Sequence, residues 1–214
     1  LEGYVPADDV DNVRAAAEEN GWGIVIGDPA PDDEPPTLIR NPAWLRPVET
    51  VFSFIDTYPG YRERDISGVF YFFFSIFYAM LIGDAGYGAV LLLLTIAIHA
   101  WKGRSIPKQP LYLMYVLNIA TIVWGVITGS YFGVTLPDQA LVSRCVVLDS
   151  TDFGKTVYLC FILAVVQLVI AHVWNAVRVI NSIRAVGELG YAGIVITMYF
   201  VANTLILDKP FPTW

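Results

Sequence analysis

An acidic residue lies within the most apolar part of this 214-residue sequence. Asp84 is the only formally charged residue between Val69 and Trp101. A carboxylate is costly to place in a membrane-like stretch, and such residues commonly take part in moving ions. The alternative is structural, because a helix that begins at Ala85 would be capped by Asp84 through backbone N–H bonds. We favour the cap and keep a direct part in ion movement as the alternative.

Glycines surround this aspartate, in the order Gly83-Asp84-Ala85-Gly86-Tyr87-Gly88. A phosphate-binding loop needs Lys followed by Ser or Thr, and neither is present, which excludes that chemistry. Glycines here instead permit a tight turn or the close approach of another helix. Gly125, Gly129 and Gly133 recur at four-residue spacing, which predicts one smooth packing ridge on a membrane helix.

Polar side chains also occur in two later apolar stretches. Gln167 and His172 lie in the stretch 156–177, and Glu188 stands near the start of the stretch 186–207. Hydrogen bonds between helices would explain the first two, and a favourable position at a helix N-terminus would explain the glutamate. A water-filled ion path would use the same groups. The candidates for an ion path are therefore Asp84, Glu188, His172 and Gln167.

The sequence contains no pattern that predicts a catalytic site. There is no Ser-His-Asp arrangement, no nucleotide fingerprint after a strand and no cluster with metal-ligand spacing. Cys145 and Cys160 form no CxxC pair and have no histidine at zinc spacing. We therefore expect no catalytic residue, metal or cofactor in this chain.

Composition indicates a membrane protein. Hydrophobic residues make up 56% of the chain and charged residues 15%, whereas about 45–50% apolar is usual for soluble domains. Residues 1–67 hold 14 acidic and 5 basic residues, and the remainder holds 6 and 8. No basic stripe is present to neutralise phosphates, so nucleic acid is not an expected partner. The predicted fold class is α, a polytopic transmembrane helix bundle with a small N-terminal α/β remnant.

Residues 1–47 are predicted to be a small α/β fragment followed by a Pro-rich linker. Residues 2–6 and 22–26 have the composition of strands, and a helix capped by Asp8 and Asp9 is expected between them. Six prolines between Asp28 and Pro47 indicate an extended linker. This fragment cannot bury a core alone, so it must dock on other material.

Residues 48–214 are predicted to be a membrane domain with about five transmembrane helices. The predicted spans are 69–83, 85–101, 111–133, 156–177 and 186–207. A single helix over 69–101 would be about 50 Å long, well beyond the roughly 30 Å hydrocarbon core. We therefore favour a hairpin that turns near Asp84 over one long tilted helix.

Basic residues decide the expected orientation. They lie in two short loops, as Lys102, Arg104 and Lys108 in the first and Arg178 and Arg184 in the second. The positive-inside rule places both loops in the cytoplasm and the loop 134–155 outside. With the hairpin, the N-terminal segment is then also cytoplasmic, whereas a single first span would put it outside.

Several segments together resemble a known family. They are Glu2–Pro6, Pro36–Pro42, Met80–Gly88 and Trp124–Gly133, in this order along the chain. In these segments, the sequence is similar to subunit a of rotary V/A-type ATPases, which is called subunit I in prokaryotes. The Gly-Asp-x-Gly-Tyr-Gly string on a membrane hairpin is the most specific of these matches.

The resemblance implies a membrane stator that moves protons or sodium ions beside a rotating ring. It also implies that residues 1–47 are the end of a cytoplasmic α/β arm plus the linker. Its implied partners are that ring of small membrane subunits, the peripheral-stalk and central-stalk subunits, and the lipid bilayer. The family's essential arginine lies on a late span, which we expect beyond Trp214, so it is assigned to no residue here. A non-transporting membrane anchor or assembly protein and an unrelated polytopic transporter are the alternatives.

Overall fold

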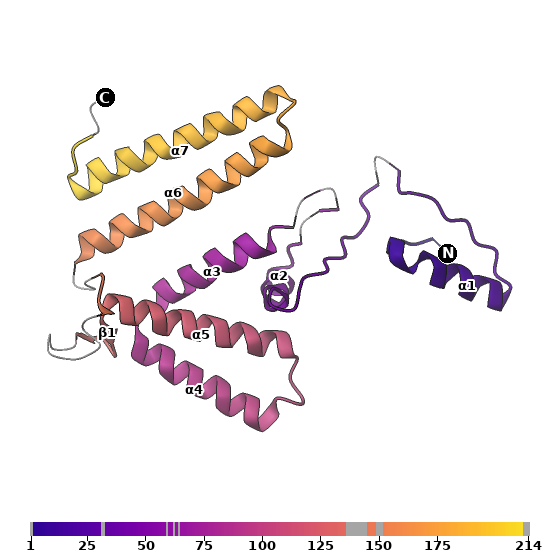
Figure 1. Ribbon diagram of the computed structural model, residues 1–214, viewed down its shortest axis with the longest axis horizontal. Coiled ribbons are helices and arrows are strands. Elements are labelled where there is room, and N and C mark those ends of the chain that lie inside the picture. Colours follow the sequence, from indigo (N-terminus) through magenta and orange to yellow (C-terminus); the bar gives the residue numbers. More distant parts are fainter. Residues whose placement is uncertain are drawn as a thin grey trace. The chain divides into compact units, whose positions relative to one another are not determined.

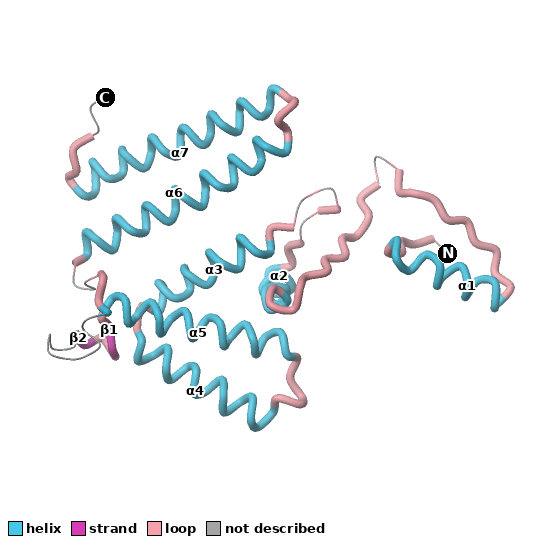
Figure 2. Tube along the Cα trace, in the orientation of Figure 1, coloured by secondary structure: helices cyan, strands magenta, loops and turns pink. Residues whose placement is uncertain are grey.

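The computed structural model describes residues 2–30, 33–58, 60–61, 63, 65–135, 145–148 and 152–211. These residues are mainly helical (Figures 1 and 2). The α-helices are α1 (Val10–Asn20), α2 (Glu49–Ile55), α3 (Ser67–Ile82), α4 (Ala85–Lys102), α5 (Lys108–Thr128), α6 (Phe153–Arg178) and α7 (Ile183–Leu207). Two 3-10 turns, η1 (Ala7–Asp9) and η2 (Arg46–Val48), and two short strands, β1 (Ser130–Tyr131) and β2 (Val134–Thr135), complete the described elements. The predicted α-helical fold class is confirmed.

The chain divides into two compact units. One consists of residues 1–72 and 98–114, and the other of residues 73–97 and 115–214. The boundaries fall within α3, α4 and α5, and each unit is described by itself.

In the first unit, the predicted strands at 2–6 and 22–26 are not formed. The helix between them is present as α1, which ends at Gly21 with a left-handed φ of 65°. Val25 is fully exposed and Trp22 is 66% exposed. A strand needs a neighbour to satisfy its backbone groups, and this fragment supplies no sheet edge.

A small core in the first unit holds the linker against α2 and the start of α3. Val48 and Phe52 are buried, and the rings of Phe52 and Phe70 lie 5.0 Å apart. The Asn41 side-chain amide, also buried, donates to Glu49 Oε1 at 3.2 Å and to Ser67 Oγ at 3.3 Å. Asn41 therefore fixes the end of the Pro36–Pro42 segment to both helices.

Four of the helices are long and apolar enough to cross a membrane, namely α4, α5, α6 and α7. The helix α3 is also apolar but has 16 residues, which corresponds to about 24 Å, less than the roughly 30 Å of hydrocarbon. The hairpin turn lies at Gly83 and Asp84, between α3 and α4. Residues 136–144 and 149–151, within the predicted outer loop, lie outside the described residues.

The predicted glycine ridge is wrong for two of its three members. The helix α5 ends at Thr128, so Gly129 and Gly133 lie beyond it. Both have positive φ, 71° and 74°, which is a left-handed conformation that ends helices and forms turns. Only Gly125 remains on a helix. The apolar run continues past the true helix end, and hydropathy alone does not detect the turn.

The helices α4 and α5 pack closely through small residues and one polar pair. A Cβ on Gly88 would lie 3.0 Å from the Ile122 backbone nitrogen, so the two helices approach within the width of a side chain. Asn118 Nδ2 donates to Thr95 Oγ1 at 2.9 Å, and both residues are buried. Such a bond between helices satisfies polar groups that lipid could not.

The helices α6 and α7 form an antiparallel hairpin and lie side by side along their length (Figure 1). Asp152 caps α6 by accepting from Lys155 N at 3.0 Å, and Ser182 caps α7 by accepting from Arg184 N. The alanines Ala176, Ala185 and Ala192 are buried.

Candidate functional site

The Asp84 carboxylate is held by four hydrogen bonds. Oδ1 accepts from Tyr87 N at 3.0 Å and Phe132 N at 2.9 Å, and Oδ2 accepts from Ser130 Oγ and Gly133 N, both at 2.8 Å. The residue is 4% exposed. The bond from Tyr87 is an N-terminal cap of α4, and the other three come from the segment after α5. We call this arrangement the Asp84 clamp.

Local backbone geometry brings the donors to the carboxylate. Gly83 adopts a φ of 69° and its amide donates to Ala79 O at 2.8 Å, which ends α3 and leaves Asp84 at the start of α4. In the segment after α5, Tyr131 pairs with Val134 in the β1–β2 ladder. The two residues between them have positive φ, so their amides point to one side of the turn, where the carboxylate lies.

The clamp keeps Asp84 ionised. Burial raises the pKa of this carboxyl, but the hydrogen bonds from Gly133, Tyr87, Phe132 and Ser130 outweigh that effect and lower it to about 2. A carboxylate whose oxygens each accept two bonds stabilises its charged form. This geometry favours a structural anion over a group that exchanges ions at neutral pH.

Glycines around the clamp are required by close contacts. A Cβ on Gly125 would lie 2.0 Å from Ala85 N, and one on Gly86 would lie 2.6 Å from the Phe132 ring. The Phe132 ring also packs edge-on against Tyr87 with a centroid distance of 5.5 Å. The close approach predicted at these glycines therefore occurs. Gly125 meets the start of α4, and Gly86 meets the turn that follows α5.

His172 and Glu188 form a second polar cluster, on the α6–α7 hairpin. His172 Nδ1 lies 2.7 Å from Glu188 Oε2, and each side chain is 27% exposed. The imidazole also stacks on the Tyr191 ring with a centroid distance of 5.6 Å. We call these three residues the His–Glu cluster. It joins the two helices and leaves part of each titratable side chain uncovered by the described residues.

The other ion-path candidates do not belong to this cluster. Gln167 is partly exposed on α6 and lies five positions before His172, which corresponds to about 140° around the helix. The four donors to Asp84 come from residues outside the α6–α7 hairpin. Among the described residues, the ion-path candidates therefore divide between the Asp84 clamp and the His–Glu cluster, and Gln167 belongs to neither.

Sequence reasoning missed several groups that the structure brings together. Ser130 and the amides of Phe132 and Gly133 lie more than forty residues from Asp84 in sequence, and no local pattern announces this contact. The His172–Glu188 pairing had a signal, because each residue stands eight positions from Ile180 in the turn of an antiparallel hairpin. Within the described residues, no group of three or more His, Cys, Asp and Glu side chains could hold a metal ion.

Comparisons with known proteins reveal a consistent set of relatives. The sequence is 30% identical over 221 residues to V-type ATP synthase subunit I of Borreliella burgdorferi, covering 98% of this chain and 36% of that protein. It is 31% identical over 219 residues to V-type ATP synthase subunit I 1 of Treponema pallidum, covering 98% and 35%. An A-type ATP synthase subunit I of Archaeoglobus fulgidus is 29% identical over 133 residues, covering 62% and 19%.

The chain thus spans about a third of the length of the first two relatives. No protein-family model matches the sequence.

Proposed function

Because the chain belongs to the V-type and A-type ATP synthase subunit I family, we propose that it is part of the membrane stator of a rotary ATPase. In this role it lies beside the rotating ring, contributes to the movement of protons or sodium ions, and links the membrane sector to the cytoplasmic arm. The similarity over 98% of the chain carries this proposal. The partners follow from the same role: the ring, the peripheral and central stalks, and the lipid bilayer.

The His–Glu cluster supports a part in ion movement. Its members lie on two apolar helices that are long enough to cross a membrane. An intramembrane pair of titratable groups that remains partly exposed can exchange protons with water in a cavity. We propose that Glu188 and His172 line part of the wall of one aqueous half-channel, and that Asp84 holds the scaffold of α4 and α5 beside it in the same subunit.

The basic residues at the helix ends support the proposed orientation. Lys102 ends α4 and Lys108 begins α5, while Arg178 ends α6 and Arg184 stands in the first turn of α7. Both loops are cytoplasmic by the positive-inside rule, which keeps the N-terminal segment in the cytoplasm if α3 and α4 form a membrane hairpin. We assign the essential arginine of the family to none of these residues.

The native cysteines test this orientation. Cys145 is exposed, whereas Cys160 is partly buried within α6. In sealed right-side-out vesicles, we expect a membrane-impermeant maleimide to label Cys145 and not Cys160. The variant Cys145→Ser should abolish the labelling. Labelling of Cys145 only in inverted vesicles would show that the orientation is reversed.

Purification from native membranes through a tag on this subunit tests the stator role. We expect the ring and the ATPase head subunits to purify with it. Substituting Glu188→Gln or His172→Gln in that complex should reduce ion pumping severalfold while leaving assembly intact, because the pair loses a titratable group. Since the two residues act together, the double variant should lose no more than the stronger single variant.

The control is Asn175→Ala, which removes an exposed polar side chain from the same helix and should pump normally. If both variants of the pair pump ions as well as the wild type does, the His–Glu cluster is not part of the ion path. That result would not contradict the stator role. A tagged subunit that purifies without ring or head subunits would instead refute the stator role and favour a non-transporting membrane anchor.

A further inference from the structure

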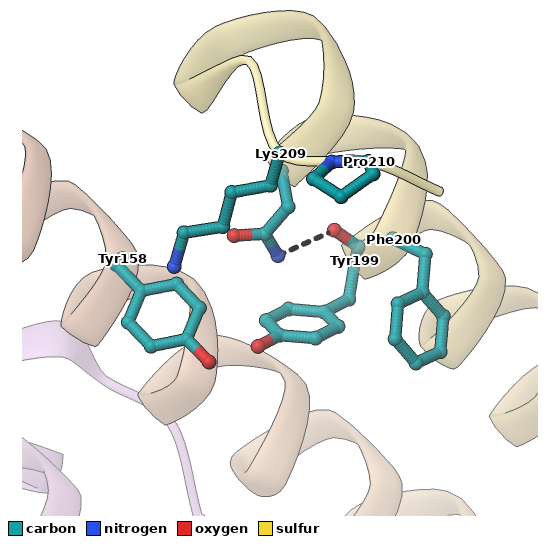
Figure 3. Close-up of a pocket in the computed structure, with 6 residues that line it drawn as sticks. Tyr158, Tyr199, Phe200, Lys209 and Pro210 are labelled. Atoms are coloured by element: carbon teal, nitrogen blue, oxygen red, sulfur yellow. Dashed lines mark hydrogen bonds between the residues drawn. The ribbon is translucent and has the colours of Figure 1, made fainter. Parts of the chain in front are cut away.

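A cavity of about 240 Å³ lies at the end of the α6–α7 hairpin away from the His–Glu cluster. Figure 3 shows its lining side chains, which come from the start of α6, the end of α7 and the residues after it. They are Tyr158, Tyr199, Phe200, Asn203, Lys209 and Pro210. We call it the hairpin cavity.

A backbone reversal after α7 builds one wall of the cavity. Asp208 has a left-handed φ of 52°, and Lys209 N donates back to Asn203 O at 3.3 Å. The chain therefore folds over the helix end instead of continuing away from it. This turn places Lys209 Nζ 3.1 Å from the centroid of the Tyr158 ring on the neighbouring helix. It also brings the Phe211 ring to 6.2 Å from that of Phe200.

Asn203 presents an unsatisfied acceptor among these lining residues. Its side chain is anchored, because Nδ2 donates to Tyr199 O at 2.8 Å (Figure 3). The residue is 5% exposed, yet Oδ1 accepts no hydrogen bond from the described part of the chain. A buried acceptor without a donor is unfavourable. The Asn203 oxygen thus calls for a ligand that brings an O–H or N–H group.

The surroundings indicate what kind of ligand this is. Lys209, one of the lining residues, supplies a positive charge, and tyrosine and lysine side chains are typical of a membrane boundary. Leu205 and Ile206, near the end of α7, are 76% and 57% exposed, so an apolar tail has a surface on that helix to follow. A ligand with an anionic group, a hydrogen-bond donor and apolar chains matches all three features.

We propose that the hairpin cavity binds the headgroup of a phospholipid. The phosphate pairs with the Lys209 ammonium, and a headgroup hydroxyl or primary ammonium donates to Asn203 Oδ1. The acyl chains then run along the apolar surface of α7. This proposal is independent of the stator role, because it concerns one end of a single hairpin.

Lipid binding to the purified complex tests the proposal. Native mass spectrometry would measure the affinity for phosphatidylglycerol, which has phosphate and hydroxyl groups, and for phosphatidylcholine, whose headgroup has no N–H or O–H donor. We expect phosphatidylcholine to bind about tenfold more weakly, which is one lost hydrogen bond to a buried group. Glycerol 3-phosphate, which lacks acyl chains, should not displace the lipid.

Two variants separate the contacts. Lys209→Gln removes the charge and Asn203→Leu removes the unsatisfied acceptor, and each should weaken phosphatidylglycerol binding about tenfold. In Asn203→Leu the preference over phosphatidylcholine should also vanish. Since Lys209 lies after the last helix, its variant keeps the test valid even where Asn203→Leu folds poorly.

The matched control is Lys102→Gln. Lys102 Nζ also lies over an aromatic ring, 4.7 Å from the Trp101 centroid, and its loss should leave lipid affinity unchanged. If both lipids bind with equal affinity and neither cavity variant changes that affinity, the bound lipid is ordinary annular lipid. Water would then donate to the Asn203 oxygen, and the proposal would be wrong. Displacement by glycerol 3-phosphate would show a phosphate site rather than a lipid site.

Discussion

Replacing Asp84 by asparagine is expected to destabilise the chain by about 3 kcal/mol or more and to reduce its assembly into a complex. The carboxylate accepts four hydrogen bonds, and an amide cannot accept on both sides. Its NH2 group would face either Tyr87 N and Phe132 N or Ser130 Oγ and Gly133 N. The Ser130 hydroxyl can turn to accept from the NH2 group, but the backbone amides cannot, so at least one N–H is left facing a donor and the remaining bonds lose the carboxylate charge. Each hydrogen bond to a charged group contributes about 1.5–3 kcal/mol, which accounts for the estimate.

Thermal unfolding of the purified protein in detergent would measure this change. Ser130→Ala removes one of the four donors and should cost less than Asp84→Asn, about 1.5 kcal/mol. Asp152→Asn is the matched control, because Asp152 caps α6 at an exposed position and its loss should cost clearly less than the loss of the Asp84 carboxylate. Normal stability and assembly of Asp84→Asn together with abolished ion flux would contradict the clamp and support the ion-path alternative.

The clamp also predicts a dependence on pH. The pKa of Asp84 is about 2 in the folded chain, below its ordinary value of 3.8. The stabilisation by the carboxylate is therefore complete well above pH 4 and is lost as the pH falls toward 2. Wild type and Asp84→Asn should thus converge in stability at low pH.

A side chain at Gly125 is expected to have an effect as large as the loss of the clamp. A Cβ there would lie 2.0 Å from Ala85 N and 2.6 Å from both Ala85 Cα and the Asp84 carbonyl carbon. These are backbone atoms, which cannot rotate away as a flexible side chain does. Gly125→Ala should therefore separate the start of α4 from α5 and cost about 3 kcal/mol or more, at the upper end for overpacking.

Gly190→Ala is the control for this substitution. Gly190 also lies in an apolar helix, α7, but a Cβ there would meet nothing within 4 Å. Its variant should be unchanged or more stable by up to about 1 kcal/mol, because alanine favours helix more than glycine does. Thermal unfolding and the yield of assembled complex would compare the two. Equal stability of both variants would show that α4 and α5 do not approach as closely as described.

The sequence predicts helices well where one local property decides them. Long apolar runs account for α4 to α7, and Asp84 before Ala85 predicts the cap, because the capping bond to Tyr87 N spans only three residues. The glycine string predicts the turn for the same reason. Gly83 has the left-handed φ that such a turn requires.

Features that depend on distant residues escape the same reasoning. Residues 22–26 have the composition of a strand, but the described part of this unit offers no sheet edge with which they could pair. Strand propensity alone is therefore not enough to form a strand there. Gly129 and Gly133 continue an apolar pattern but serve as a turn, because Asp84 binds the amides there. Asn203 shows no signal in sequence, since its oxygen is buried without a donor only in the folded chain.

The clamp has a consequence for synthesis and membrane insertion. Its donors at Ser130 and Gly133 follow Asp84 by 46 and 49 residues. At about 5–20 residues per second, roughly 2 to 10 seconds pass before they emerge. During that interval the carboxylate at the hairpin tip must be kept hydrated or sheltered by the insertion machinery. Membrane insertion of α3 and α4 is therefore expected to remain reversible until α5 and the following turn have been synthesised and donate to Asp84.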